Sequence, residues 1–374
     1  MEIDMEEEMN NFIMVWFTVA MSSCYCYGTT KLVPKGTIRF LLFLPALCLL
    51  YILPLYLKAL IFSIPTAFFV TWLTSFKLLL LVFDSGPLST PSLSLIHFLT
   101  IYCLPIKLQK PTSPTKQNGP YKQNNQNSVT LNINLGFLIH YAIKGFIFYL
   151  LTIVGYNKHM LPQKLASFLI CIYAYLGLEL SLVAFAMIGR VVLGIEAARP
   201  FDHPYLSTSL QDFWGRRWNR VAAGALKSTI FYPTLNGTSR LLGRKWAAIV
   251  AAVVTFVVSD VMHEVIFYYM GRVKFGGGIP TFFIFQGICV VIESTIKKRM
   301  EAKWRLPQTI IGLLVFVFNL STFMLLALPE LLELRVDDRV LAEYVALGHF
   351  LKDLGPTWAK MGRPFRTQFT STQM

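Results

Sequence analysis

Residues 246–271, WAAIVAAVVTFVVSDVMHEVIFYYMG, form a long and mostly apolar run. It exceeds the roughly 20 mostly apolar residues that a helix needs to cross a bilayer. It nevertheless carries Ser259, Asp260, His263 and Glu264 within little more than one helical turn. Ionisable groups at membrane depth are costly and mark candidate functional sites. The stretch therefore predicts a transmembrane helix with a polar site inside it.

Apolar runs of the same kind recur along the whole chain. The region 59–106 is interrupted by Lys77, His97 and several prolines, so it is expected to add one or two spans. Including the opening stretch, clear candidates are 11–29, 37–57, 135–155, 165–189, 246–271, 279–295 and 308–328. We therefore predict an all-α, polytopic helical membrane protein with eight or nine transmembrane helices.

The composition supports a membrane protein and excludes other classes. Of the 374 residues, 55% are hydrophobic and 14% are charged, against about 25% charged in soluble domains. The net charge of +14 could indicate nucleic acid binding, but cytoplasmic loops of membrane proteins collect Lys and Arg. The six cysteines form no CxxC pair and the six histidines have no metal-ligand spacing. We expect no nucleic acid partner, no metal and no disulfide framework.

The distribution of charge suggests an orientation and internal divisions. The acidic N-terminus is expected in the lumen and the basic loops in the cytoplasm. Val340, Tyr344, Leu347, Leu351 and Leu354 form one apolar face that Gly355-Pro356 should end. Within a single integral-membrane domain, 1–374, we separate a flexible cytoplasmic loop, 107–134, a cytoplasmic or interfacial motif region, 190–245, a polar-site helix and its following spans, 246–328, and an amphipathic tail, 329–374.

Two groups of ionisable residues lie inside the predicted spans. Lys144 and Glu179 stand on consecutive spans and are expected to pair. On the later helix, Ser259 and Asp260 precede His263 by four and three residues, so all three share a face. A desolvated imidazole there suits a general base. The alternative is a structural role, in which these polar side chains form hydrogen bonds to neighbouring helices.

A second concentration of chemistry is the run FDHPYLSTSLQDFWGRRWN, residues 201–219. Tryptophans at headgroup level and arginines in the aqueous layer suit an interfacial anchor, while arginine pairs also bind phosphates. Both interpretations stay open. The residues concerned are Asp212, Trp214, Arg216, Arg217, Trp218 and Asn219. No GxSxG or Walker A motif occurs, so a serine nucleophile and a P-loop have no support.

The run 201–219, followed by SDVMHE at 259–264, resembles the plant wax synthase family of the membrane-bound O-acyltransferase superfamily. The resemblance implies a helical fold with an internal substrate tunnel. It implies that His263 is the catalytic base and that Asn219 is the second signature polar residue. Ser259 and Glu264 match supporting positions of the superfamily, whereas Asp260 matches none.

The resemblance also implies substrates and location. An acyl-CoA co-substrate, with no other cofactor, would place its phosphates near Arg216, Arg217 or other basic residues of 190–245. A long-chain alcohol would enter from the bilayer lipids and leave as a wax ester, in the endoplasmic reticulum membrane. Alternatives are a sterol acyltransferase, a diacylglycerol acetyltransferase and, from another class, a proton-coupled transporter. The oligomeric state stays open, a homo-oligomer included.

Overall fold

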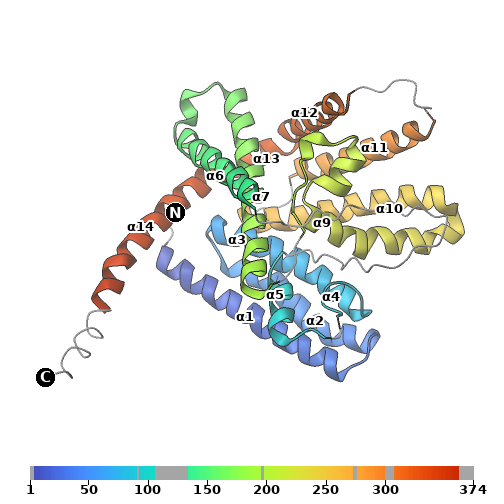
Figure 1. Cartoon of the computed structure of the whole chain (residues 1–374), viewed down its shortest axis with the longest axis horizontal. Helices are drawn as coiled ribbons and strands as arrows, with labels where there is room; N and C mark the ends of the chain where they lie inside the picture. The colour runs from blue at the N-terminus through green and yellow to red at the C-terminus, as the bar shows by residue number, and fades with distance from the viewer. Residues whose placement is uncertain are drawn as a thin grey trace.

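The computed structural model describes residues 4–90, 92–105, 134–194, 198–272, 276–299 and 307–361. Its regular elements in these ranges are all helices, as the sequence predicts (Figure 1). The long helices are α1 (Met5–Leu32), α2 (Thr37–Ile52), α6 (Leu135–Tyr156), α7 (Gln163–Leu193), α10 (Tyr232–Gly271), α11 (Gly278–Arg299), α12 (Gln308–Leu326) and α14 (Val336–Met361). The predicted flexible loop lies outside the described residues except for its last residue, Asn134.

Eight helical segments among the described residues are long and apolar enough to cross a membrane. The region 59–106 supplies one of them, Leu60–Val82, built from α3 (Leu60–Thr66), the π-helical η2 (Ala67–Thr74) and α4 (Ser75–Val82). The following α5 (Leu95–Cys103) has nine residues and therefore reaches only about 14 Å, half of the hydrocarbon thickness. The structure thus supports eight spans, the lower of the two predicted numbers.

The segment Leu60–Val82 lies at the centre of the bundle. Of its most apolar window 78% is buried, against 6% for α6. Every residue of η2 is buried, including Trp72. Pro65 lacks the amide proton of a regular helix, and the π-helical backbone begins two residues later. Such π turns occur frequently at functional sites, and Trp72 stands on this one.

Helix α10 is interrupted by Gly243, whose φ of 71° and ψ of 155° are not helical. Figure 1 shows the chain reversing direction there, so that two helical arms lie side by side. The first arm begins with α9 (Arg220–Leu226) and η6 (Lys227–Phe231), and its Ile230 belongs to the same apolar cluster as Met262 of the second arm. The predicted polar-site helix, 246–271, is this second arm.

Three apolar clusters build the core. The first joins α1, α2, α4 and α5. The second joins the central segment to α7, α9 and α10, and includes Trp72. The third joins α10 to α11 and includes Phe283. The polar-site helix thus belongs to two clusters, which brings residues far apart in the sequence to its two sides.

Charged side chains bond the helix termini at one end of the bundle. Glu8 is 1% exposed and accepts hydrogen bonds from the amides of Lys58 and Ala59, both at 3.0 Å. Glu343 of α14 accepts one from the Ile61 amide at 2.9 Å. The helix N-terminus at α3 has no side-chain cap of its own, so two distant carboxylates bind amides at its first turn and just before it.

The same end holds further contacts between distant segments. Arg272 donates to the carbonyls of Leu55 and Leu57 at 3.0 and 3.1 Å. Glu330 accepts from the amides of Gly276 and Ile279 at 2.9 and 3.2 Å. We call this the capping end, consisting of the N-terminal turn of α1 and residues 53–61, 157–162, 270–279 and 328–343. With eight spans these connections lie on one side of the membrane and the predicted basic loops on the other.

Helix α14 lies across the capping end (Figure 1). Of the predicted apolar face, Val340 packs against the second apolar cluster, whereas Tyr344 and Leu351 are 42% and 55% exposed. The face is therefore only partly packed, and Leu341 and Glu343, which lie outside it, are buried against the bundle. The prediction that Gly355-Pro356 ends the helix was wrong, because the helical backbone continues to Met361. A proline removes one helical hydrogen bond, which bends or weakens a helix without always ending it.

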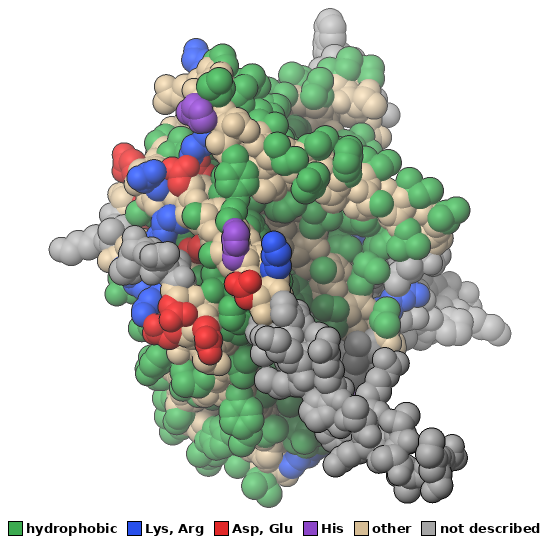
Figure 2. All heavy atoms as spheres, turned by 90° about the vertical axis from the view of Figure 1, so that its left-hand side faces the viewer, with side chains coloured by type: hydrophobic (Ala, Val, Ile, Leu, Met, Phe, Trp, Pro, Cys, Tyr) green, Lys and Arg blue, Asp and Glu red, His purple; other side chains and the backbone are tan. Residues whose placement is uncertain are grey.

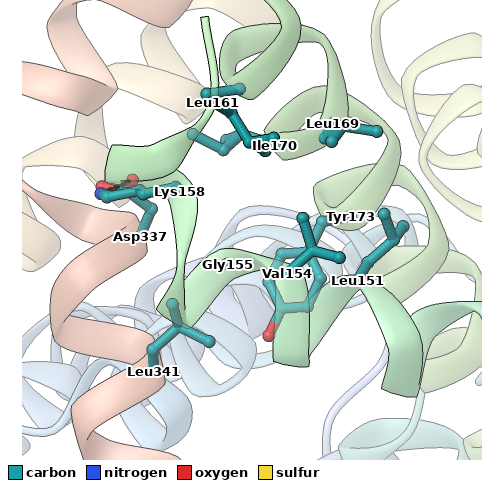
Figure 3. Close-up of a pocket in the computed structure, with 11 residues that line it drawn as sticks. Leu151, Val154, Gly155, Lys158, Leu161, Leu169, Ile170, Tyr173, Asp337 and Leu341 are labelled. Atoms are coloured by element: carbon teal, nitrogen blue, oxygen red, sulfur yellow. Dashed lines mark hydrogen bonds and ion pairs between the residues drawn. The ribbon is translucent and has the colours of Figure 1, made fainter. Parts of the chain in front are cut away.

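The contact between α14 and the α6–α7 turn encloses a small apolar pocket of about 30 Å³. Figure 3 shows Leu341 and Asp337 of α14 facing Gly155, Val154 and Lys158. Lys158 pairs with Asp337 and Asp338. Figure 2, viewed from the side of α14, shows charged side chains gathered in a band on an otherwise mostly hydrophobic face. This distribution fits an aqueous rim beside a lipid-facing surface.

Candidate active site

His263 lies on the second arm of α10 with its imidazole between two aromatic walls. Its Nδ1 is 2.7 Å from the carbonyl oxygen of Ser259, one turn earlier. A carbonyl only accepts hydrogen bonds, so Nδ1 carries the proton and Nε2 of the neutral ring has the free lone pair. Ser259 thus acts on His263 through its backbone, and this geometry leaves Nε2 available as a base.

Trp72 and Phe283 form the two walls. The Trp72 ring lies 5.1 Å from the imidazole centroid in an edge-on arrangement. The Phe283 ring lies 4.3 Å away at a tilt of 34°. Trp72 comes from the central segment and Phe283 from α11, so three spans meet at His263. Apolar walls exclude water, which strengthens electrostatic interactions with a reacting group.

Asp260 and Glu264 lie one helical turn apart on the same helix and are 8% and 6% exposed. Asp260 Oδ1 and both carboxylate oxygens of Glu264 are buried without a hydrogen-bond partner in the described part of the chain. A buried carboxylate without a partner is unfavourable. These two groups are therefore available to bind a proton or a polar group of a substrate.

Asn219 precedes α9 and has a positive φ of 30°. Asparagine tolerates this left-handed region better than most residues. Its Oδ1 accepts a hydrogen bond from the Ala222 amide at 3.1 Å and so caps α9. Ala222 belongs to the same apolar cluster as Trp72, which contacts His263. Asn219 and His263 therefore flank one packed region, with no direct hydrogen bond between them among the bonds described.

The arginines of the Trp-rich block differ in their environments. Asp212 Oδ2 accepts from Arg217 Nε at 2.7 Å and from the Thr208 amide at 3.1 Å. Burial by itself would raise the pKa of Asp212, but these bonds outweigh it and hold the pKa below its ordinary value. Arg217 also donates to the Asp202 carbonyl at 3.2 Å. Arg217 is thus already paired, whereas Arg216 is exposed.

The two tryptophans of the block are half-buried and pack against other aromatic side chains. Trp214 Nε1 donates to Gln286 Oε1 at 3.2 Å, and the indole packs 6.2 Å from Phe283. Trp218 stacks on Phe213 at 5.4 Å. Trp214 therefore connects the block to the wall of the His263 site.

Three residues around the site were not predicted: Trp72, Phe283 and Gln286. Gln286 is fully buried and bridges Trp214 and Thr322, with a bond of 2.7 Å to the Thr322 hydroxyl. A lone amide inside the apolar run 279–295 was a usable signal for it. No comparable signal marks Trp72 or Phe283, because an aromatic residue in an apolar span is ordinary.

Two other sequence predictions can be compared with the structure. Lys144 Nζ lies 2.6 Å from Glu179 Oε1, which confirms the predicted pair. The described residues contain no group of three or more His, Cys, Asp or Glu side chains that could hold a metal ion. The two cavities described, at α14 and at the start of α6, are lined by residues other than His263. The internal tunnel therefore stays a prediction.

Comparison with known proteins identifies the family. The model of the membrane bound O-acyl transferase family matches residues 198–285, which contain Asn219, His263 and Phe283. The chain is 41% identical to acyl-CoA–sterol O-acyltransferase 1 of Arabidopsis thaliana over 345 residues, 91% of this chain and 96% of that protein.

Two further relatives are similar over nearly their whole length. Long-chain-alcohol O-fatty-acyltransferase of Simmondsia chinensis is 36% identical over 93% of this chain and 97% of its own. Probable long-chain-alcohol O-fatty-acyltransferase 9 of Arabidopsis thaliana is 34% identical over 87% and 92%. With its eight candidate spans and these relatives, the chain is a multi-pass membrane enzyme and belongs to the membrane bound O-acyl transferase family.

Proposed function

We propose that the protein transfers a fatty acyl group from acyl-CoA to the hydroxyl of a long-chain fatty alcohol, forming a wax ester. The observation that carries the proposal is His263, with a free Nε2 between Trp72 and Phe283 inside the bundle. The names of the relatives from Simmondsia chinensis and Arabidopsis thaliana support the alcohol as acceptor.

The chemistry needs no acyl-enzyme. His263 Nε2 takes the hydroxyl proton as the alcohol oxygen attacks the thioester carbonyl. The new carbon–oxygen bond forms, the carbon–sulfur bond breaks, and the imidazolium returns the proton to the CoA thiolate. The capping bond of Asn219 uses Oδ1 and leaves the side-chain NH₂ to stabilise the oxyanion. Asp260 and Glu264 are available to orient the alcohol hydroxyl.

The test uses microsomes that contain the wild type or His263→Ala, supplied with labelled long-chain acyl-CoA and a long-chain alcohol. We expect a wax ester from the wild type and at least about a hundredfold less from the variant, at equal protein levels in the membrane. His159→Ala is the matched control, because His159 is exposed in the connection between α6 and α7, at the capping end. Wild-type turnover by His263→Ala would refute the assigned base.

A sterol is the second candidate acceptor, because the relative at 41% identity is named a sterol O-acyltransferase. Adding a sterol and diacylglycerol to the same assay, with acetyl-CoA as a second donor, separates the alternatives by product mass. A dominant steryl ester would identify a sterol as the acceptor in place of the fatty alcohol. An acetylated diacylglycerol would identify diacylglycerol as the acceptor and acetyl-CoA as the donor.

Two properties of the whole protein complete the proposal. We infer residence in the endoplasmic reticulum membrane, which fractionation against organelle markers tests. Ester formation in detergent, where no ion gradient exists, separates catalysis from coupled transport. Family membership and the enclosed His263 support catalysis.

A further inference from the structure

A polar cavity of about 270 Å³ lies between the start of α6, the middle of α7 and the segment 198–203. It belongs to neither the His263 walls nor the capping end. Its lining includes His140, Lys144, Glu179, Arg199 and His203. At about 30 Å³ per water molecule, the volume suffices for a small polar group of a ligand.

The floor of the cavity is the Lys144–Glu179 pair. Lys144 neutralises Glu179 through the 2.6 Å contact to Oε1, and the Tyr141 hydroxyl donates to the same oxygen at 3.3 Å. Glu179 is 2% exposed, and its Oε2 is buried without a hydrogen-bond partner in the ranges that the structure describes. Oε2 is thus enclosed beneath the cavity, and the Lys144–Glu179 pair leaves no net charge at the floor.

Arg199 supplies a further positive charge at the cavity. Its Nε is buried without a hydrogen-bond partner in the described ranges. The contact described for its guanidinium is the Phe137 ring, whose centroid lies 5.9 Å away. A guanidinium binds phosphate through two parallel hydrogen bonds, which makes arginine the preferred residue for this anion.

Two histidines complete the donor side. The rings of His140 and His203 lie 6.2 Å apart on opposite elements of the cavity wall. His203 Nδ1 is bonded to the Tyr205 hydroxyl at 2.7 Å, which leaves Nε2. The cavity thus combines the Arg199 guanidinium and two imidazoles above the neutralised Lys144–Glu179 pair.

The cavity wall is bonded to the segment that carries Asn219. The Arg220 amide donates to the Pro200 carbonyl at 2.7 Å, and the Asp202 amide donates to the Arg217 carbonyl at 3.0 Å. Residues 199–203 and 217–220 are therefore joined by two backbone hydrogen bonds. The segment that lines the cavity thus lies beside the proposed oxyanion donor, Asn219.

We propose that this cavity binds a phosphate group of the acyl-CoA donor. Arg199 pairs with the phosphate, and His140 and His203 donate to it. The inference rests on the proposed function and adds a donor-binding site outside residues 212–218.

The test compares two donors with the same acyl thioester, acyl-CoA and acyl-pantetheine, which lacks every phosphate. Arg199→Gln raises the KM for acyl-CoA about tenfold, the effect of one charge-assisted hydrogen bond. The same variant leaves the KM for acyl-pantetheine and the kcat for both donors unchanged. Arg199→Lys keeps the positive charge but cannot make two parallel hydrogen bonds, so it gives an intermediate KM. Lys35→Gln removes an exposed charge on the same side of the membrane and serves as control.

The remaining outcomes each have one meaning. An equal rise in KM for both donors assigns Arg199 a structural role and overturns the proposal. In another outcome, Arg199→Gln changes the KM for neither donor, but its activity, unlike that of the wild type, depends on phosphatidylserine in phosphatidylcholine vesicles. That result assigns the cavity to a lipid headgroup and overturns acyl-CoA as the source of the phosphate. No change in any arm overturns the site. If the wild type forms no ester at all, the proposed function has failed. The site is then tested by thermal unfolding with CoA alone: protection of the wild type but not of Arg199→Gln supports the site, and equal protection overturns it.

Discussion

Charged side chains at the capping end and on the polar-site helix differ in their hydrogen bonding. At the capping end, Glu8, Glu330 and Arg272 each bond two or more backbone groups of a distant connection. On α10, Asp260 Oδ1 and both Glu264 oxygens have no partner in the described residues.

The difference follows from what each region does. A desolvated charge is tolerated when hydrogen bonds replace its lost hydration. At the capping end those bonds also satisfy free helix termini, so the charges stabilise the fold. On α10 the missing partners are consistent with groups that a substrate or a proton completes. Substitutions should therefore separate stability from turnover in the two regions.

The largest effect is expected at Asn219, which combines both kinds of role. Asn219→Asp keeps an oxygen for the Ala222 amide but loses the NH₂ donors. We expect kcat to fall about 10²–10³-fold, the effect of one lost oxyanion donor, with thermal stability in detergent unchanged. Asn219→Ala should lose both turnover and about 1 kcal/mol of stability from the cap. Normal kcat in Asn219→Asp would leave Asn219 as a cap alone.

At the capping end, Arg272→Met should act on stability alone. It removes donors to three carbonyls, those of Pro54, Leu55 and Leu57. Hydrogen bonds to charged groups are worth about 1.5–3 kcal/mol, so we expect a clearly lower unfolding midpoint in detergent. The kcat of the fraction that remains folded should be unchanged. A lower kcat at full stability would show that the two regions are coupled.

Asp260→Asn should give the reverse pattern. It removes a buried charge without breaking any hydrogen bond of Oδ1 that the structure describes. Stability should stay equal or increase, while turnover should fall about tenfold if the carboxylate orients the alcohol. Ester formation and thermal unfolding are measured on the same preparation. Reduced stability with normal turnover would make Asp260 a structural residue.

The smallest effect is a pH dependence at Asp212. Burial raises its pKa, but the bonds from Thr208 and Arg217 outweigh burial, so the folded pKa lies below the unfolded one. The stability that this gives is present above the ordinary value of about 3.9 and is lost as pH falls through the folded pKa. Unfolding midpoints below about pH 4 should fall less steeply for Asp212→Asn than for the wild type. Parallel curves would exclude the pair as a contributor.

Much of the membrane layout could be predicted from the sequence. A span requires a run of apolar residues, and the charged exceptions Lys144, Glu179 and His263 stand out against it. The same argument predicted the Lys144–Glu179 pair, which the structure confirms. The resemblance added roles for His263 and Asn219, which stay predictions about catalysis.

The surroundings of those residues could not be predicted in the same way. Arg217 resembles Arg216 in the sequence, yet Arg217 is paired with Asp212 while Arg216 is exposed. Arg199 was included only among the basic residues of 190–245, because its individual significance lies in the cavity beside α6 and α7. Such distinctions depend on which partners the packed chain places beside each charge.

A multi-pass helical membrane protein with a polar site at 259–264 could be inferred from the residues alone. The reason is local: in a bilayer each segment must satisfy its own backbone hydrogen bonds, so apolar length alone predicts the helices. Even the Nδ1 bond of His263 is made within its own turn. Only the tertiary structure placed Trp72, Phe283 and Gln286 around that turn and Arg199 at its cavity. Those contacts join segments far apart in the chain, and helix packing rather than local pattern decides them.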